Sequence, residues 1–80
     1  MIVELIEHLV GGIVAYPDDV DVRAKNLRRG VIYEVRVNPS DLGKVIGRSG
    51  RTATAIRTVV NAIVGKGSAR IDFVDVDRRR

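Results

Sequence analysis

A four-residue turn with glycine at each end, Gly47-Arg48-Ser49-Gly50, joins two segments of helical pattern and restricts the fold more than any other feature. The segment before it begins with residues that favour a helix start. Asn38 can cap a helix, Pro39 suits the first helical position, and Asp41 favours the positive end of the helix dipole. A glycine then ends this helix after about two turns. The sequence therefore predicts a short helix that leads directly into the turn.

A longer helix is predicted after the turn, from Gly50 to about Val64. At about 100° per residue its apolar residues fall on one side, which we expect to pack against a sheet. That side consists of Ala53, Ile56, Val59, Val60, Ile63 and Val64. The other side should face water or a ligand, and it carries Arg51, Thr54, Arg57, Thr58 and Asn61.

Strand patterns flank these helices in the sequence. Apolar and polar residues alternate over residues 20–25 and again over 31–37, and the connection at 26–30 predicts that the two strands pair as a hairpin. A further strand is predicted from Ala69, after a glycine-containing turn at 65–68.

The beginning of the chain has the pattern of an amphipathic helix. Its polar side includes His8, which we interpret as a surface histidine, and Tyr16-Pro17-Asp18-Asp19 ends the segment. The apolar side consists of Ile2, Leu5, Ile6, Leu9 and Ile13. The predicted order is helix, strand, strand, helix, helix, strand, which indicates an α+β fold with helices packed on one face of a three-stranded sheet.

Composition argues against several functions. A chain of 80 residues with no cysteine and one histidine offers no disulfide, no thiolate metal site and no histidine-based triad, so we expect neither enzymatic activity nor a cofactor. The longest mostly apolar stretch, residues 2–15, contains acidic residues and is shorter than the ~20 residues of a membrane span. It also lacks the basic start of a secretory leader. These features predict a cytoplasmic protein that does not bind a membrane.

Positive charge is concentrated in the second half of the chain. Residues 1–40 carry five basic and six acidic side chains, whereas residues 41–80 carry nine and four. The window 44–70 contains basic residues and no aspartate or glutamate. Such a window attracts polyanions.

The glycine turn lies inside this basic window and leads into a helix N-terminus, where free N–H groups favour a phosphate. It does not match a nucleotide-binding Walker A loop, because Val45 stands where the first glycine is needed and Arg51 replaces the lysine. It does not match a dinucleotide-binding loop either, because it follows a helix instead of a strand. A DNA-binding helix-turn-helix and a protein-interaction module remain alternatives.

The run Val45-Ile46-Gly47-Arg48-Ser49-Gly50-Arg51-Thr52 resembles the Ile-Gly-x-x-Gly signature of KH domains, which lies between two short helices. With its preceding helix and strand, the element order is similar to that of type II, or bacterial, KH domains, and the length resembles their small stand-alone members. The resemblance implies one KH-like domain over residues 1–80, with a core at 31–76, an extension at 2–26 and a frayed tail at 77–80. Ala53 departs from the large aliphatic residue usual at its position, which implies a shallower hydrophobic floor.

By this resemblance, the turn would clamp the sugar-phosphate backbone of about four unpaired nucleotides of single-stranded RNA. Val45 and Ile46 are interpreted equally well as floor residues under the bases or as core. Arg57 and Arg70 are interpreted equally well as residues that border the groove or as solvated surface. The expected RNA-binding residues are Lys44, Val45, Ile46, Gly47, Arg48, Ser49, Gly50, Arg51, Thr52 and Lys66. Because aromatic residues are few, base stacking cannot be the main mode, and we expect weak, salt-sensitive binding of low sequence selectivity.

One weak site gains from a second module. We therefore expect a homodimer, or a complex with a larger RNA-binding protein that has its own KH domain, as the resemblance suggests. The resemblance also implies a role as an RNA chaperone or post-transcriptional regulator that is linked to cell-wall and cell-length control.

Overall fold

Helices and strands follow one another in the order that the sequence predicts. The computed structural model describes residues 1–65 and 69–75. Its α-helices are α1 (Ile2–Gly11), α2 (Leu42–Ile46) and α3 (Arg51–Val64), and its strands are β1 (Asp21–Leu27), β2 (Gly30–Val37) and β3 (Ala69–Asp75). Single turns of 3-10 helix lie in the connections, namely η1 (Pro17–Asp19), η2 (Pro39–Asp41) and η3 (Arg48–Gly50).

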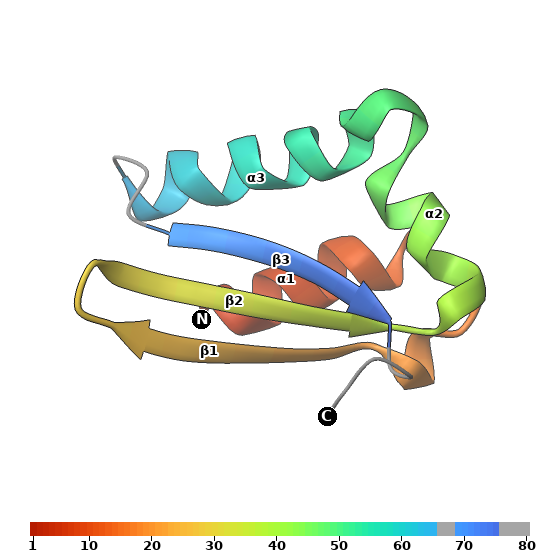
Figure 1. Ribbon diagram of the computed structural model, residues 1–80, viewed down its shortest axis with the longest axis horizontal. Coiled ribbons are helices and arrows are strands. Elements are labelled where there is room, and N and C mark those ends of the chain that lie inside the picture. Colours follow the sequence, from red (N-terminus) through yellow and green to blue (C-terminus); the bar gives the residue numbers. More distant parts are fainter. Residues whose placement is uncertain (66–68, 76–80) are drawn as a thin grey trace.

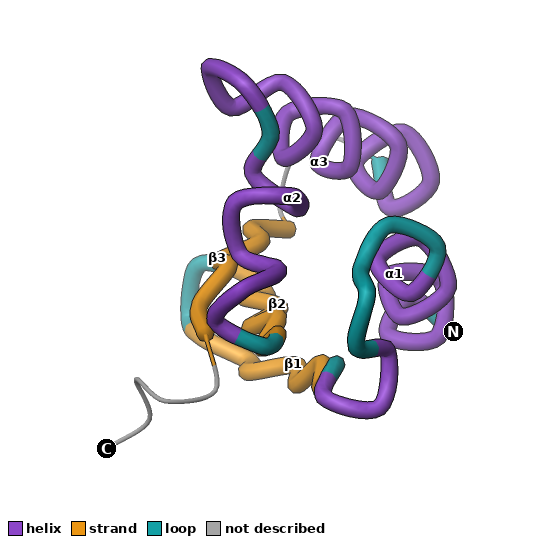
Figure 2. The backbone as a smooth tube through the Cα atoms, turned by 90° about the vertical axis from the view of Figure 1, so that its right-hand side faces the viewer, coloured by secondary structure: helices purple, strands orange, loops and turns teal. Residues whose placement is uncertain are grey.

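The strands form one sheet in the order β1-β2-β3. β1 and β2 are antiparallel and form the predicted hairpin, whereas β2 and β3 are parallel, with Val31 opposite Ala69. A parallel pair needs a crossover connection, which α2, the glycine turn and α3 provide. All the helices lie on one face of the sheet (Figures 1 and 2), so the predicted α+β arrangement is confirmed. β3 is therefore an edge strand that runs beside the turn region.

The hydrophobic core lies between this face of the sheet and the helices. Each helix contributes fully buried side chains, such as Ile6 and Val10 from α1, Val45 from α2 and Val60 from α3. Val35, Val37 and Ile71 come from the sheet. Because α1 and α3 both pack on the sheet and on each other, the crossover that carries the glycine turn is joined to the core.

The hairpin differs from its predicted form in two respects. Its strands extend to Leu27 and from Gly30, so that the turn is only Arg28-Arg29 instead of the whole segment 26–30. In the alternating pattern of residues 20–25 the apolar positions are Val20, Val22 and Ala24, but of these only Val22 is buried. The reason is that the far end of the hairpin projects beyond α1, which therefore covers only the first part of β1 (Figure 1).

The apolar side of α3 is also narrower than predicted. Ala53, Ile56 and Val60 are buried, whereas Val59, Ile63 and Val64 belong to the exposed side chains. A helix that crosses a sheet at its surface buries a stripe of about 100°, and the predicted set is wider than that stripe. Val59 and Ile63, which are 43% and 54% exposed, follow one another on one flank of the helix.

The start of the second helical segment has the residues that the sequence predicts there, and Asp41 has an additional role. Asn38 does act as a cap, because its Oδ1 accepts a hydrogen bond of 2.9 Å from the Ser40 N–H. Asp41 also lies at the helix start, as the N-cap residue of α2, but its side chain forms no capping hydrogen bond there. Its carboxylate is fully buried and accepts hydrogen bonds of 3.0 Å from the backbone N–H groups of Ala15 and Tyr16. The turn η2 precedes α2 and directs this side chain towards the α1–β1 connection.

Within the residues that the structure describes, no helix has the length and apolar character needed to cross a membrane.

Candidate nucleic-acid interface

The turn between α2 and α3 adopts a backbone that glycine favours. Gly47 has φ +77° and ψ 172°, and Gly50 has φ +75° and ψ 14°, both in regions that side-chain-bearing residues rarely occupy. The Gly50 N–H donates to the Gly47 carbonyl at 3.1 Å, which closes the turn. The backbone conformation of the turn therefore requires glycine at both positions.

Gly47 also meets a steric requirement. A Cβ atom at this position would lie 2.8 Å from both the backbone nitrogen and the Cβ of Thr52, closer than side-chain atoms pack. The first turn of α3 thus approaches the main chain of Gly47 directly. Thr52 therefore lies directly beside the turn. That Thr52 contacts a ligand remains a prediction.

Ser49 is the one feature of the turn that the sequence did not predict. It has φ +56° and ψ 25°, which is the left-handed region, although serine carries a Cβ. Residues held in this region cost of order 1 kcal/mol or more and persist where the surrounding structure imposes them. Its side chain is exposed, next to that of Arg48, which is also exposed.

The beginning of α3 is open to a ligand. Its N-cap residue, Gly50, forms no side-chain capping hydrogen bond. The first N–H groups of a helix lack partners within the helix, and together with the helix dipole they favour an anion. Arg48 and Arg51 are exposed here, and within residues 1–65 and 69–75 neither forms an ion pair. The turn therefore presents positive charge that is not neutralised by any carboxylate of the described part of the chain.

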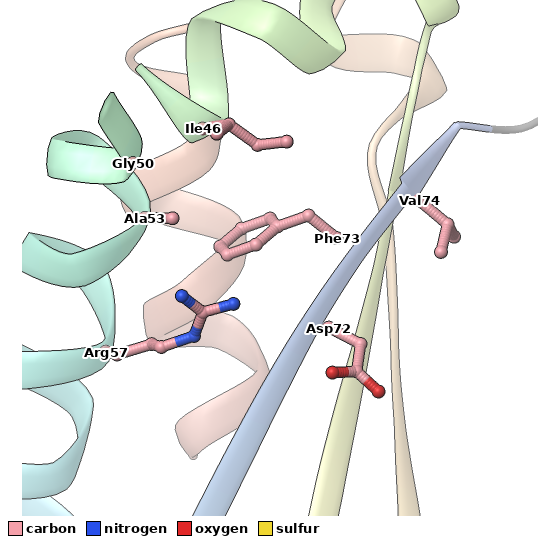
Figure 3. Close-up of a pocket in the computed structure, with 7 residues that line it drawn as sticks. All are labelled: Ile46, Gly50, Ala53, Arg57, Asp72, Phe73 and Val74. Atoms are coloured by element: carbon pink, nitrogen blue, oxygen red, sulfur yellow. The ribbon is translucent and has the colours of Figure 1, made fainter. Parts of the chain in front are cut away.

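A groove runs from this turn along the edge of the sheet. It has a volume of about 410 Å³ and is lined by Ile46, Gly50, Ala53, Arg57, Asp72, Phe73 and Val74. Figure 3 shows Ile46, Ala53 and the Phe73 ring directed into it from α2, α3 and β3. The walls are apolar close to the turn, while Arg57 stands further along α3. Such a surface suits a flat ligand that has apolar faces and polar edges.

The structure separates the two residues whose roles the sequence left open. Ile46 is 36% exposed and lines the groove, whereas Val45 is fully buried in the core. Successive residues of a helix point about 100° apart, so only one of them can face the groove. Gly47, Arg48, Ser49, Gly50, Arg51 and Thr52 lie together in and after the turn. Lys66 lies outside the described residues.

Lys44 lies one turn before the glycine turn and is held by an acidic partner. Its Nζ is 3.5 Å from Oδ1 of Asp41, while its side chain is 53% exposed. Burial acts to raise the pKa of Asp41, but the hydrogen bonds from Ala15 and Tyr16 and the positive charge of Lys44 outweigh it, so the pKa is lowered from its usual value. Asp41 is therefore an anion that orients Lys44 and compensates part of its charge.

Arg57 lines the groove, a role that the sequence left open against solvated surface. Its Nε and Nη2 donate to the carbonyl oxygen of Ile71 at 3.3 and 3.1 Å. Its Cζ lies 5.5 Å from the centre of the Phe73 ring, within cation–π range. The sequence signal for a binding role of Arg57 was its place on the polar side of the predicted helix. Its contacts with Ile71 and Phe73 could not be inferred, because β3 is distant from α3 in the sequence. Arg70, in contrast, is 74% exposed.

Comparison with known protein families gives one match over nearly the whole chain. The model described as "KhpA/KhpB, KH domain" matches residues 3–76. This range includes the glycine turn, the groove residues and the N-terminal helix and strand. The resemblance seen in the sequence is thereby confirmed at the level of the family.

Curated proteins of similar sequence have a common name. "RNA-binding protein KhpA" of Streptomyces coelicolor is 65% identical over 80 residues, which is all of both chains. The protein of that name from Mycobacterium tuberculosis is 58% identical over 98% of this chain and 96% of its own length. That from Lactiplantibacillus plantarum is 46% identical over 84% and 79%. Among solved structures there is no significant match.

Proposed function

The chain belongs to the KhpA/KhpB family of KH domains, and on that premise we propose that it binds single-stranded RNA by clamping the sugar-phosphate backbone at Gly47-Arg48-Ser49-Gly50. The family is one of RNA-binding domains and not of enzymes, so the expectation that the chain is not an enzyme is confirmed. Unpaired bases would then lie in the groove that begins at the turn.

The observation that carries the proposal is the combination of bare backbone and free charge at the turn. Gly47 and Gly50 leave no side chain between the main chain and a phosphate, and α3 begins there without a side-chain cap. Arg48 and Arg51 supply cations, and Ser49 supplies a hydroxyl. A phosphate oxygen can accept hydrogen bonds from all these groups.

The apolar groove supports unpaired bases in preference to a duplex. Base faces are apolar and base edges are polar, as the walls and the Arg57 guanidinium of the groove are. In a duplex the faces are stacked inside and cannot reach Ile46 or Phe73. With few phosphate contacts, binding is expected to be weak and to fall steeply with salt.

The test is to measure RNA binding by fluorescence anisotropy for the wild type and for Arg48→Asp/Ser49→Asp. This double variant lowers the net charge at the turn by three, because it removes one positive charge and adds two negative ones, and we expect it to bind a single-stranded RNA about tenfold or more weakly. The matched control is Asn26→Asp/Arg28→Asp, which changes the net charge equally at the distant hairpin and should bind RNA much as the wild type does. Circular dichroism checks that both variants are folded.

The same experiment separates the alternatives. A DNA-binding helix-turn-helix would hold duplex DNA more tightly than single-stranded RNA, and a protein-interaction module would not retain RNA at low salt. If the folded Arg48→Asp/Ser49→Asp protein binds RNA as the wild type does, the turn is not the site.

We propose further that the chain pairs with a second copy of itself through the exposed flank of α3. Val59 and Ile63 lie there together with exposed Ala55 and Ala62, and this flank carries no charge between them. Two copies could pack these side chains without bringing like charges together, and the dimer would offer two clamps to one RNA. A larger KH-containing RNA-binding protein is the alternative occupant, and it would displace the second copy in a mixed sample.

In the cell we propose the role of an RNA chaperone or post-transcriptional regulator in the cytoplasm, with a link to cell-wall and cell-length control. Weak clamping of the backbone fits a chaperone, because it holds unpaired strands without arresting them. An annealing assay with two complementary RNA hairpins tests this role. The wild type should speed annealing, and Arg48→Asp/Ser49→Asp should not.

A further inference from the structure

The guanidinium of Arg57 is fixed at the groove by one of its two hydrogen-bonding edges. Nε and Nη2 form one edge, and both donate to the same acceptor, the carbonyl oxygen of Ile71, at 3.3 and 3.1 Å. The Phe73 ring supports the group from one side, with 5.5 Å between Cζ and the ring centre. Three contacts from β3 therefore define the position of a side chain that would otherwise sample many rotamers.

The second edge of the guanidinium, formed by Nη1 and Nη2, is left for a ligand. A guanidinium has five N–H donors, and two of the five are directed to Ile71. Within the described residues Arg57 forms no other hydrogen bond and no ion pair. Figure 3 shows the group on the groove side of α3, beside the ring of Phe73.

The neighbouring acidic residue does not compete for this edge. Figure 3 shows the Asp72 carboxylate on the far side of β3, directed away from Arg57. Its Oδ1 lies 3.8 Å from Nε of Arg70, which stands on that same outer face of the sheet. Among residues 1–65 and 69–75, the two parallel donors of Arg57 thus meet the groove without a protein acceptor opposite them.

Two parallel donors select particular bases. Guanine offers O6 and N7 side by side, and cytosine offers O2 and N3 side by side, so each can accept both N–H groups at once. In uracil the two carbonyls flank the N3–H donor, and in adenine each candidate ring acceptor lies beside the amino group or stands alone. Adenine and uracil can therefore accept only one of the two hydrogen bonds.

We propose that Arg57 is a specificity-determining residue that selects guanine or cytosine over adenine and uracil at one position of the bound RNA. The inference rests on the proposed function, since it assigns a base to the groove beside the clamp. The apolar walls around Ile46, Ala53 and Phe73 favour a base over a phosphate at this point. The low sequence selectivity expected from the scarcity of aromatic residues is thereby revised for one nucleotide.

The experiment compares four eight-nucleotide RNAs: oligo(U), oligo(A), oligo(C), and oligo(U) with one central guanosine. The wild type should bind oligo(C) or the guanosine-containing RNA about fivefold or more tightly than oligo(U) and oligo(A). Replacing that guanosine with 7-deazaguanosine, or the cytidines with 3-deazacytidine, removes one acceptor and should abolish the preference.

Two variants isolate the edge of Arg57. Arg57→Lys keeps the positive charge but cannot donate two parallel hydrogen bonds, so it should bind all four RNAs within about twofold of one another. Arg70→Ala removes a charge from the same region outside the groove, and it should keep the wild-type preference. Circular dichroism confirms the fold of each.

Three results would overturn the inference. They are equal affinity of the wild type for all four RNAs, a preference that persists in folded Arg57→Lys, and a uniform loss of affinity for all four RNAs without change of preference, which marks a phosphate contact. Failure of the proposed function is distinct from these, because the wild type would then bind none of the RNAs.

Discussion

The carboxylate of Asp41 accepts a hydrogen bond of 3.0 Å from the backbone N–H of Tyr16, a residue 25 positions earlier in the chain. A second hydrogen bond of the same length comes from Ala15, and Asn38 donates to Asp19 at 2.9 Å nearby. The connection between α1 and β1 is thus fastened to the start of α2. The N-terminal helix and strand thereby support the segment that carries the glycine turn.

This relationship predicts a pH-dependent contribution to stability. Because the pKa of Asp41 is lower in the folded chain than its usual value of 3.8, the carboxylate stabilises the fold fully above that value, and the contribution is lost as the pH falls through the folded pKa. We expect Asp41→Asn to unfold several degrees below the wild type at pH 7. The two melting temperatures should approach one another as the pH falls from 3.8 towards the lower pKa of the folded chain, and should converge below that folded pKa. Thermal melts followed by circular dichroism across this range provide the measurement, and an equal gap at both ends of the range would contradict the assignment.

Gly47→Ala should destabilise the protein by about 1–3 kcal/mol, because the new Cβ would meet the main chain of Thr52 and the residue would be held at positive φ. Gly43→Ala is the matched control. A Cβ at Gly43 meets nothing within 4 Å, and alanine favours a helix, so this change should stabilise by about 0.5–1 kcal/mol. Urea unfolding measures both. Equal effects of the two substitutions would show that the geometry of Gly47 is unimportant.

Arg48→Gln should reduce the salt dependence of RNA binding. For single strands each phosphate contact contributes a slope of about −0.7 to the plot of log K against log salt concentration, so removing one contact should make the slope shallower by about 0.7. Arg70→Gln, which removes a charge away from the turn, should leave the slope unchanged. A slope unaltered by Arg48→Gln would place this arginine outside the phosphate path.

Ile63→Lys should leave the fold intact and weaken self-association. Ile63 is 54% exposed, so a lysine there costs the isolated chain about 0.5 kcal/mol or less, whereas it adds a like charge to each partner of the proposed dimer. Sedimentation at increasing concentration should show a monomer where the wild type dimerises. Ile56→Ala serves as contrast, since Ile56 is 4% exposed and its truncation should cost about 2–4 kcal/mol. A wild type that remains monomeric throughout would refute this use of the α3 flank.

Much of the fold was predictable because its signals are local. Periodicity, caps and turn residues act over a few neighbours, and they predicted the helices, the hairpin and the glycine turn. The bounds differ where α1 ends already at Gly11 and where the 3-10 turn η2 delays the start of α2 to Leu42. Asn38 caps as expected, and Gly47 ends α2 as expected. The family resemblance rested on the same contiguous residues.

The sequence by itself determined that a basic, glycine-bounded turn joins two helices in an α+β domain, since each of those features depends on residues adjacent in the chain. Only the tertiary structure decided that Asp41 bonds to Tyr16, that Arg57 is fixed by Ile71 and lines the groove, and that Val59 and Ile63 stay exposed. Each of these depends on which distant segment lies opposite a side chain. The packing of α1, α3 and β3 decides which segments lie opposite one another, and no pattern of neighbouring residues encodes this packing.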